Sequence, residues 1–206
     1  LNESFYEVDK NNLSIPIILN QATPISLRIK AANNSFLENN LNVDSLAALY
    51  QSVDFASSQL NNPEKTIKEF ENNKELLIAY YYQLINIQIF PSERIEALIN
   101  FWQFANDNNL EEIAYSLSHN VTKSIEINSE NIKFSPQIAT SYIYNKDYEK
   151  ALEWIELYEN NYNADQNSSY SRILLNLNSA DTLENFSEVL SNILNDKLIT
   201  NNKINE

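Results

Sequence analysis

SPQIATSYIYNKDYEKALEWIELYENNYN, residues 135–163, is the stretch that decides the fold. It opens on Ser135-Pro136, a capping residue followed by a proline at the first helical position. A second helix is expected to open at Tyr148, because apolar residues recur there at helical spacing. Its end is expected at Asn160-Asn161, since asparagine can take the left-handed conformation that usually falls to glycine. The stretch therefore predicts two consecutive helices.

The same signals recur along the chain. Thr23-Pro24 and Asn62-Pro63 each place a capping residue before a proline, Pro91 offers a further start, and Asp44 is a candidate cap. Helical ends are expected at the other asparagine clusters. Apolar stripes with helical spacing follow these starts, at residues 25–36, 46–53, 95–102, 113–121 and 183–193.

Two segments are ambiguous. Residues 84–90 alternate apolar and polar side chains with the period of a strand, but no second strand of similar quality is present to pair with it. We therefore interpret this segment as the end of a buried helix that begins near Lys74. Residues 13–19 are compatible with a short helix after Pro16.

Three similar helix openings recur at a rough period. Residues 110–114 (LEEIA), 148–152 (YEKAL) and 183–186 (LENF) begin 38 and then 35 residues apart. Such an interval is typical of repeated helical hairpins, which bury their apolar stripes only against neighbours. The sequence predicts an all-α fold, a right-handed α-solenoid of about 8–10 helices in stacked hairpins. The repeat domain is expected over residues 23–198, after a partly ordered extension at 1–22 and before a polar tail at 199–206.

Residues 145–152 (NKDYEKAL) resemble the inter-helix turn and second-helix opening of a tetratricopeptide repeat. The first-helix tryptophan and the closing proline of that motif are missing, and Ala139 stands where the family often has glycine. The resemblance covers one unit of about 30 residues, and it implies a helical hairpin without naming a ligand. Its packing positions would be Ile138, Ala139 and Tyr142 in the first helix and Tyr148, Ala151, Ile155 and Tyr158 in the second.

Residues 24–55 are similar to a family of long alphaproteobacterial helical proteins catalogued as antifreeze glycopeptide polyproteins. The resemblance implies a bacterial, exported solenoid and no particular activity. The whole chain has six threonines and no Ala-Ala-Thr repeat, so nothing in it supports ice binding.

The composition removes several kinds of chemistry. There is no Gly, Cys or Met, His119 is the single histidine, and the net charge is −14. Thiol, zinc and Ser-His sites lack their residues, and no cofactor or metal is expected. Asn163, Asp165 and Asn167 imitate a calcium loop, but Leu174 stands where the bidentate glutamate is required. The acidic surplus disfavours nucleic acid and anionic lipid as partners, and no segment is apolar and long enough to cross a membrane.

The candidate partner-binding residues lie on the second helix of the quoted stretch and just before it. Glu149, Glu153 and Glu156 are spaced i, i+4 and i+7, so they share one helix face, expected opposite Ala151, Leu152 and Ile155. This face is either a carboxylate stripe for a cation or basic peptide, or a solvated surface. Tyr144 and Trp154 are the aromatic residues expected to be exposed.

These observations favour a non-enzymatic helical-repeat scaffold that binds a protein or peptide, and the acidic surplus suits either a basic partner or solubility alone. The alternative is a structural segment of a larger bacterial envelope protein or enzyme, since the chain begins with Leu1 and not methionine. That start suggests a cleaved precursor or an excised piece. The compartment stays open, and the alphaproteobacterial resemblance favours the bacterial periplasm or envelope over the cytoplasm. A third possibility, an all-α hydrolase, requires two carboxylates that face each other in a pocket.

Overall fold

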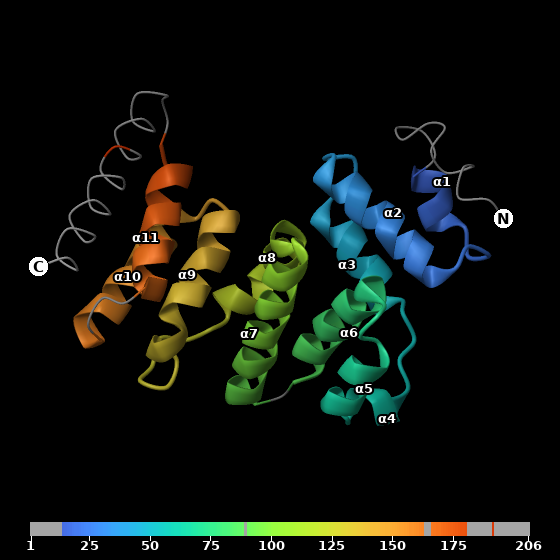
Figure 1. Cartoon of the computed structure of the whole chain (residues 1–206), viewed down its shortest axis with the longest axis horizontal. Coiled ribbons are helices and arrows are strands. Elements are labelled where there is room, and N and C mark those ends of the chain that lie inside the picture. Colours follow the sequence, from blue (N-terminus) through green and yellow to red (C-terminus); the bar gives the residue numbers. More distant parts are fainter. Residues whose placement is uncertain (1–13, 89, 163–165, 181–190, 192–206) are drawn as a thin grey trace, which may run out of the picture. The chain divides into compact units, whose positions relative to one another are not determined.

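The computed structural model describes residues 14–88, 90–162, 166–180 and 191, and within them every regular element is helical (Figure 1). The predicted all-α class is confirmed. Eleven α-helices occur in these residues, more than the expected 8–10. The four-residue α4 was not predicted, because it is too short to show an apolar pattern, whereas α5 starts at the predicted Pro63 and α1 lies in the segment that was compatible with a short helix. The helices are α1 (Ser14–Leu19), α2 (Ile25–Leu37), α3 (Val43–Gln51), α4 (Ser57–Leu60), α5 (Pro63–Glu69), α6 (Lys74–Ile87), α7 (Pro91–Asn108), α8 (Glu111–Lys123), α9 (Ser135–Tyr144), α10 (Tyr148–Asn161) and α11 (Gln166–Asn178), with the 3₁₀ helix η2 (Ile132–Phe134).

Contacts divide the chain into two compact units, residues 1–121 and 122–206, with the boundary inside α8. Helix α1 lies in the extension expected at residues 1–22. The expected tail, and the apolar stripe at 183–193, lie outside the described residues, apart from residue 191.

Asparagine and aspartate side chains start several helices. Oδ1 of Asn42 accepts a hydrogen bond from the backbone N–H of Ser45 (2.8 Å), and Asn62 and Asn73 cap α5 and α6 in the same way. Such bonds satisfy backbone donors that have no partner inside the helix. The cap predicted at Asn62 is thus confirmed.

Other predicted caps are wrong. Asn42 caps α3, and Asp44 lies in its first turn. Pro24 itself, and not Thr23, is the residue before α2. Ser135 is already helical (φ −52°, ψ −41°), so α9 starts on it, and its buried Oγ has no hydrogen-bond partner among the described residues.

The ambiguous segments are both helical. Helix α6 runs from Lys74 to Ile87, as predicted, and buries side chains on most of its surface. Residues 14–19 form α1, which includes Pro16 in its first turn, where a proline costs no helical hydrogen bond.

Aromatic side chains dominate the core of the first unit. The ring of Tyr80 in α6 lies edge-on to Phe55, with centroids 5.4 Å apart, and Tyr81 packs against Phe101 and Phe104 of α7. In the next pair of helices, Trp102 Nε1 donates a hydrogen bond to Ser118 Oγ (2.9 Å). Aromatic pairs of this kind contribute burial and preferred ring geometry together.

A buried polar network also ties α6 to α2 and α3. Gln83 Nε2 donates hydrogen bonds to the backbone oxygens of Tyr50 (2.7 Å), in the last turn of α3, and of Val53 (2.6 Å), just beyond it. The hydroxyl of Tyr50 donates to Asn33 Oδ1 of α2. Gln83 therefore satisfies carbonyls at the end of a helix distant in sequence.

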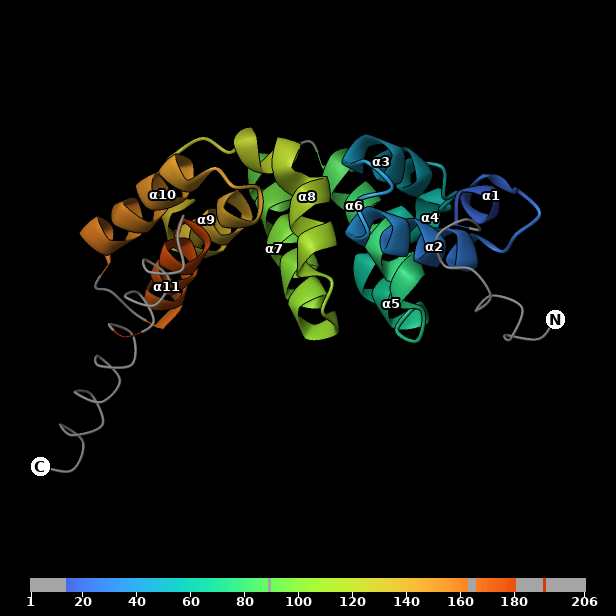
Figure 2. The same cartoon turned by 90° about the horizontal axis from the view of Figure 1, so that it is seen from above.

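In the second unit, α9 and α10 form an antiparallel pair joined by three residues, and α11 packs against both (Figures 1 and 2). Ile138, Ala139, Ala151 and Ile155 are fully buried. Hydroxyls hold α11 to α9, since Ser171 Oγ donates to the backbone oxygen of Pro136 (2.9 Å) and lies 3.2 Å from Thr140 Oγ1.

In the part of the chain that the structure describes, three residues take positive φ, namely Asn39 (60°), Asn109 (57°) and Lys146 (61°). The asparagines end α2 and α7, as predicted. Asn160 and Asn161 instead complete α10, and Asn73 starts α6. Lys146, in the turn between α9 and α10, has no sequence signal for this conformation.

Lys146→Asn is expected to raise the free energy of unfolding by about 0.5–1 kcal/mol, because asparagine tolerates the left-handed region better than lysine. Urea denaturation followed by circular dichroism measures the change. Lys146→Gln removes the same charge without that preference and serves as the control. Equal stabilisation by both variants would contradict a backbone origin.

A candidate partner-binding groove on helix α10

An open groove of about 390 Å³ runs along the outer face of α10 in the second unit. All three glutamates that were predicted to bind a partner line this groove, together with apolar side chains. One lining residue, Ile127, comes from the segment between α8 and η2, and the others belong to α10. The lining residues are Ile127, Glu149, Leu152, Glu153, Glu156, Leu157 and Asn160.

The two faces of α10 differ because only one is covered. Ala151 and Ile155 are fully buried in the interior of the unit, as predicted. Leu152 was expected on that buried side, but its side chain is 36% exposed and lines the groove. Successive residues of a helix are about 100° apart around its axis. Leu152 therefore lies roughly 70° around the axis from the centre of the glutamate face, close enough to line the same groove.

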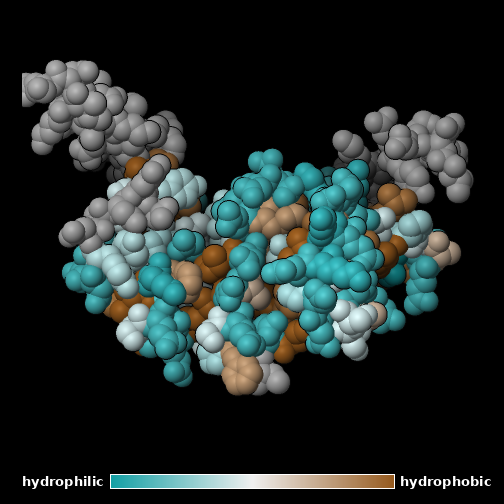
Figure 3. Space-filling model, turned by 60° about the horizontal axis from the view of Figure 1, so that its bottom comes forward, coloured by the Kyte–Doolittle hydropathy of each residue, from teal (hydrophilic) through white to brown (hydrophobic). Residues whose placement is uncertain are grey.

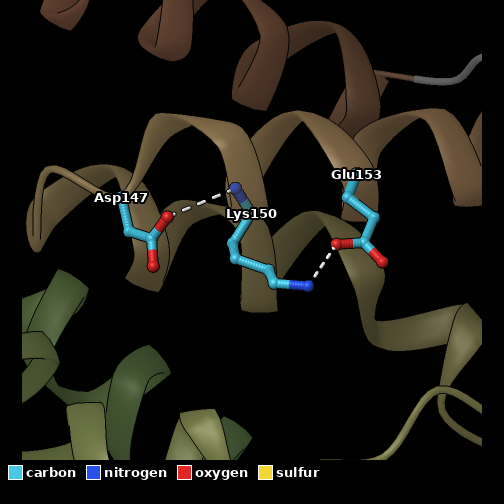
Figure 4. A network of polar contacts seen from close by, with 3 residues as sticks. All are labelled: Asp147, Lys150 and Glu153. Carbon is cyan, nitrogen blue, oxygen red and sulfur yellow. Dashed lines mark hydrogen bonds and ion pairs between the residues drawn. The ribbon is translucent and has the colours of Figure 1, made fainter.

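The carboxylates of the groove differ in their partners. Glu153 accepts a hydrogen bond from Lys150 Nζ at 2.5 Å, and both side chains are about half exposed. Figure 4 shows Lys150 reaching along α10 toward Glu153, while Asp147 caps the helix through the backbone N–H of Lys150. The hydrogen bond and charge of Glu153 raise the pKa of Lys150. Glu149 and Glu156 form no ion pair with another described residue.

The fourth glutamate of α10 has a structural role. Glu159 binds Arg172 of α11 through two hydrogen bonds, of 3.1 Å to Nε and 2.5 Å to Nη2. This fork geometry is the strong form of a carboxylate–guanidinium pair. The bond to Glu159 raises the pKa of Arg172. Glu159 therefore helps to hold α11 and lies outside the groove.

The predicted aromatic sites are not part of the groove. Trp154 was expected to be exposed, but only 2% of its side chain is accessible, so it belongs to the core. It lies roughly 130° around the helix from the glutamate face, too far to share it. Burial raises the pKa of the Tyr142 hydroxyl in the same unit. Tyr144, at the end of α9, is partly exposed and does not line the groove.

Apolar side chains are also exposed elsewhere, among them Leu19, Ile87 and Phe90. Figure 3 shows one face of the molecule, where hydrophilic side chains cover most of the surface and apolar ones emerge between them. Single exposed apolar residues are normal on protein surfaces. Ile127 (46% exposed) and Leu152 differ because they line the same groove. Ile127 carried no sequence signal, since its segment has no periodic pattern.

The described residues do not assemble the catalytic or metal sites considered from the sequence. No aspartate or glutamate among them is buried, so the facing carboxylates that a hydrolase requires do not form there. Likewise, this part of the chain holds no cluster of three or more residues suited to bind a metal ion. His119 is partly exposed on α8. Asn163 and Asp165 lie outside the described residues, as does the side chain of Asn167.

Two further observations bound the possible functions. Among the described helices, none combines the length and apolar character needed to span a bilayer. In the second unit, the α10 groove brings exposed apolar side chains and carboxylates together. Searches of protein-family models, curated proteins and solved structures found no match to the chain.

Proposed function

We propose that this chain is a non-enzymatic helical-repeat scaffold, and that its α10 groove binds a positively charged amphipathic segment of a protein partner. The observation that carries the proposal is the groove itself, where Ile127 and Leu152 expose apolar side chains beside three glutamates. Apolar side chains of a partner would bury this surface, and its cations would pair with the carboxylates.

The helical packing of the second unit supports a repeat architecture. Helices α9 and α10 form a hairpin joined by three residues, and four of the packing positions expected from the tetratricopeptide resemblance are fully buried. Tyr142 is also buried, whereas Tyr148 and Tyr158 are partly exposed. Helix α11 packs against both helices of the hairpin, where the first helix of a following unit would stack. We propose a right-handed stack of such hairpins.

Charge favours a basic partner. The groove carries Glu149, Glu153 and Glu156 with Lys150 beside them, a local charge of −2 on a chain whose net charge is −14. An acidic partner or a nucleic acid would be repelled by this field. From Glu149 to Asn160 the groove follows about 16 Å of helix, the length of three helical turns. An amphipathic helix with leucine on one face and lysine or arginine beside it fits both the length and the charge.

A synthetic amphipathic helical peptide of matching length, with leucines on one face and lysines on the other, is expected to bind the full chain. Fluorescence anisotropy of the labelled peptide measures the affinity. The double variant Glu149→Gln/Glu156→Gln is expected to weaken binding about five- to tenfold, since two exposed ion pairs are lost. Leu152→Gln is expected to weaken it as well, because it removes apolar surface from the groove.

Two controls separate groove binding from general attraction to an acidic protein. Glu69→Gln/Glu71→Gln removes the same charge from exposed positions that do not line the groove, and it is expected to change affinity less than twofold. A peptide with glutamate in place of lysine is expected not to bind. Equal losses in the two double variants, or equal binding of the two peptides, would overturn the proposal.

A further inference from the structure

Among the described residues, Lys150 is the cation that forms an ion pair with a groove carboxylate, that of Glu153. Its Nζ lies 2.5 Å from Glu153 Oε2, with 54% and 45% of the two side chains exposed (Figure 4). Glu149 precedes Lys150 by one residue and Glu156 follows it by six, and neither forms an ion pair with a described residue. The groove thus has two open carboxylates and one that is neutralised from within the helix.

We infer that Lys150 is the internal counter-ion of the groove and competes with a partner's cation for Glu153. The inference rests on the proposed function, and it names the residue that sets the affinity of that site. An ammonium or guanidinium group of the partner that approaches Glu153 meets the positive charge of Lys150 and must displace it. The partner's cation would then take the place of the Lys150 ammonium group beside the carboxylate of Glu153.

A partner's cation can displace Lys150 because the ion pair between Lys150 and Glu153 is weak. Exposed pairs three residues apart on a helix contribute little to stability, since water competes for both charges. Lys150 has a long side chain whose other rotamers reach solvent, and its backbone N–H is fixed separately by the cap from Asp147 (3.3 Å). Displacement of the ammonium group therefore leaves the start of α10 intact.

Lys150→Gln is expected to tighten binding of the lysine-containing amphipathic peptide about three- to fivefold, the change that one exposed ion pair represents. Lys146→Gln, a neutralisation outside the groove, is expected to change affinity less than twofold. Anisotropy titrations with the full chain measure both. Equal tightening by the two variants would overturn the inference, because it would reflect net charge alone.

A double-mutant cycle provides the second criterion. Glu153→Gln is expected to weaken binding less than twofold while Lys150 is present, and about fivefold in the Lys150→Gln background, where Glu153 is open to the peptide. Additive effects would overturn competition for Glu153.

The outcomes separate the inference from the proposed function. Absence of peptide binding to the wild-type chain and to Lys150→Gln would overturn both. Binding that requires Glu149 and Glu156 but shows no coupling between Lys150 and Glu153 would overturn the inference alone.

Discussion

Replacing Trp154 by alanine is expected to lower the free energy of unfolding by about 3–5 kcal/mol, the range for truncating a large aromatic side chain in a core. Only 2% of Trp154 is accessible. Alanine leaves a cavity in the second unit and removes the apolar surface that the indole buries. Urea denaturation followed by circular dichroism at 222 nm measures the loss.

Leu152→Ala is the matched control, because it truncates another α10 side chain that is 36% exposed. It is expected to cost no more than about 1 kcal/mol. Trp102, the other tryptophan of the chain, reports by fluorescence on the first unit in the Trp154→Ala variant. A loss as small as that of Leu152→Ala would show that Trp154 is a surface residue and restore it as a candidate ligand contact.

Replacing Gln83 by leucine is expected to cost about 2–3 kcal/mol, because two hydrogen bonds to backbone oxygens at the end of α3 are lost in a buried place. Leucine is similar in size, so the loss reports mainly on the polar contacts. Gln83 is 8% exposed, and its Nε2 lies within 2.7 Å of both carbonyl oxygens. Urea denaturation measures the effect, with Gln103→Leu at an exposed position of α7 as the control.

Gln83→Glu tests the same two hydrogen bonds by replacing the amide group with a carboxyl group. An ionised carboxylate has no proton to donate, and it would face two carbonyl oxygens in a buried site, so this variant is expected to be less stable than Gln83→Leu at pH 7. Burial raises the pKa of such a carboxyl, and the penalty is therefore expected to shrink as the pH falls toward that pKa. A Gln83→Leu variant as stable as the Gln103→Leu control would contradict a role for the amide in stability.

The helical class and many helix starts were predictable because their causes are local. A capping asparagine or a proline acts within one turn. The last turn of α6 was predicted as helical because the sequence offers no second strand-like segment to pair with it. The same local reasoning failed at Ser135, where the 3₁₀ turn η2 precedes α9 and makes the serine part of the helix.

Burial depended on contacts that no local pattern encodes. In the sequence Gln83 interrupts an apolar run. In the structure, backbone carbonyls 33 and 30 residues earlier accept hydrogen bonds from its amide group. The glutamate face of α10 was predicted from spacing alone. Its apolar part was not, because Ile127 approaches from another segment and the neighbouring helices leave Leu152 uncovered. Trp154 was placed between the apolar stripe and the glutamate face and was expected to be exposed, but the packing of the second unit buries it.

The lack of glycine also shapes the state into which this protein unfolds. Every residue carries a β-carbon, so the denatured chain samples fewer backbone conformations than one with ordinary glycine content. Exchanging a glycine for alanine at a compatible position typically gains about 0.4–1 kcal/mol through this effect. The entropy that folding must overcome is correspondingly smaller along the whole chain. Part of the protein's stability is therefore set by the restricted freedom of its denatured ensemble, and is invisible in any contact of the native fold.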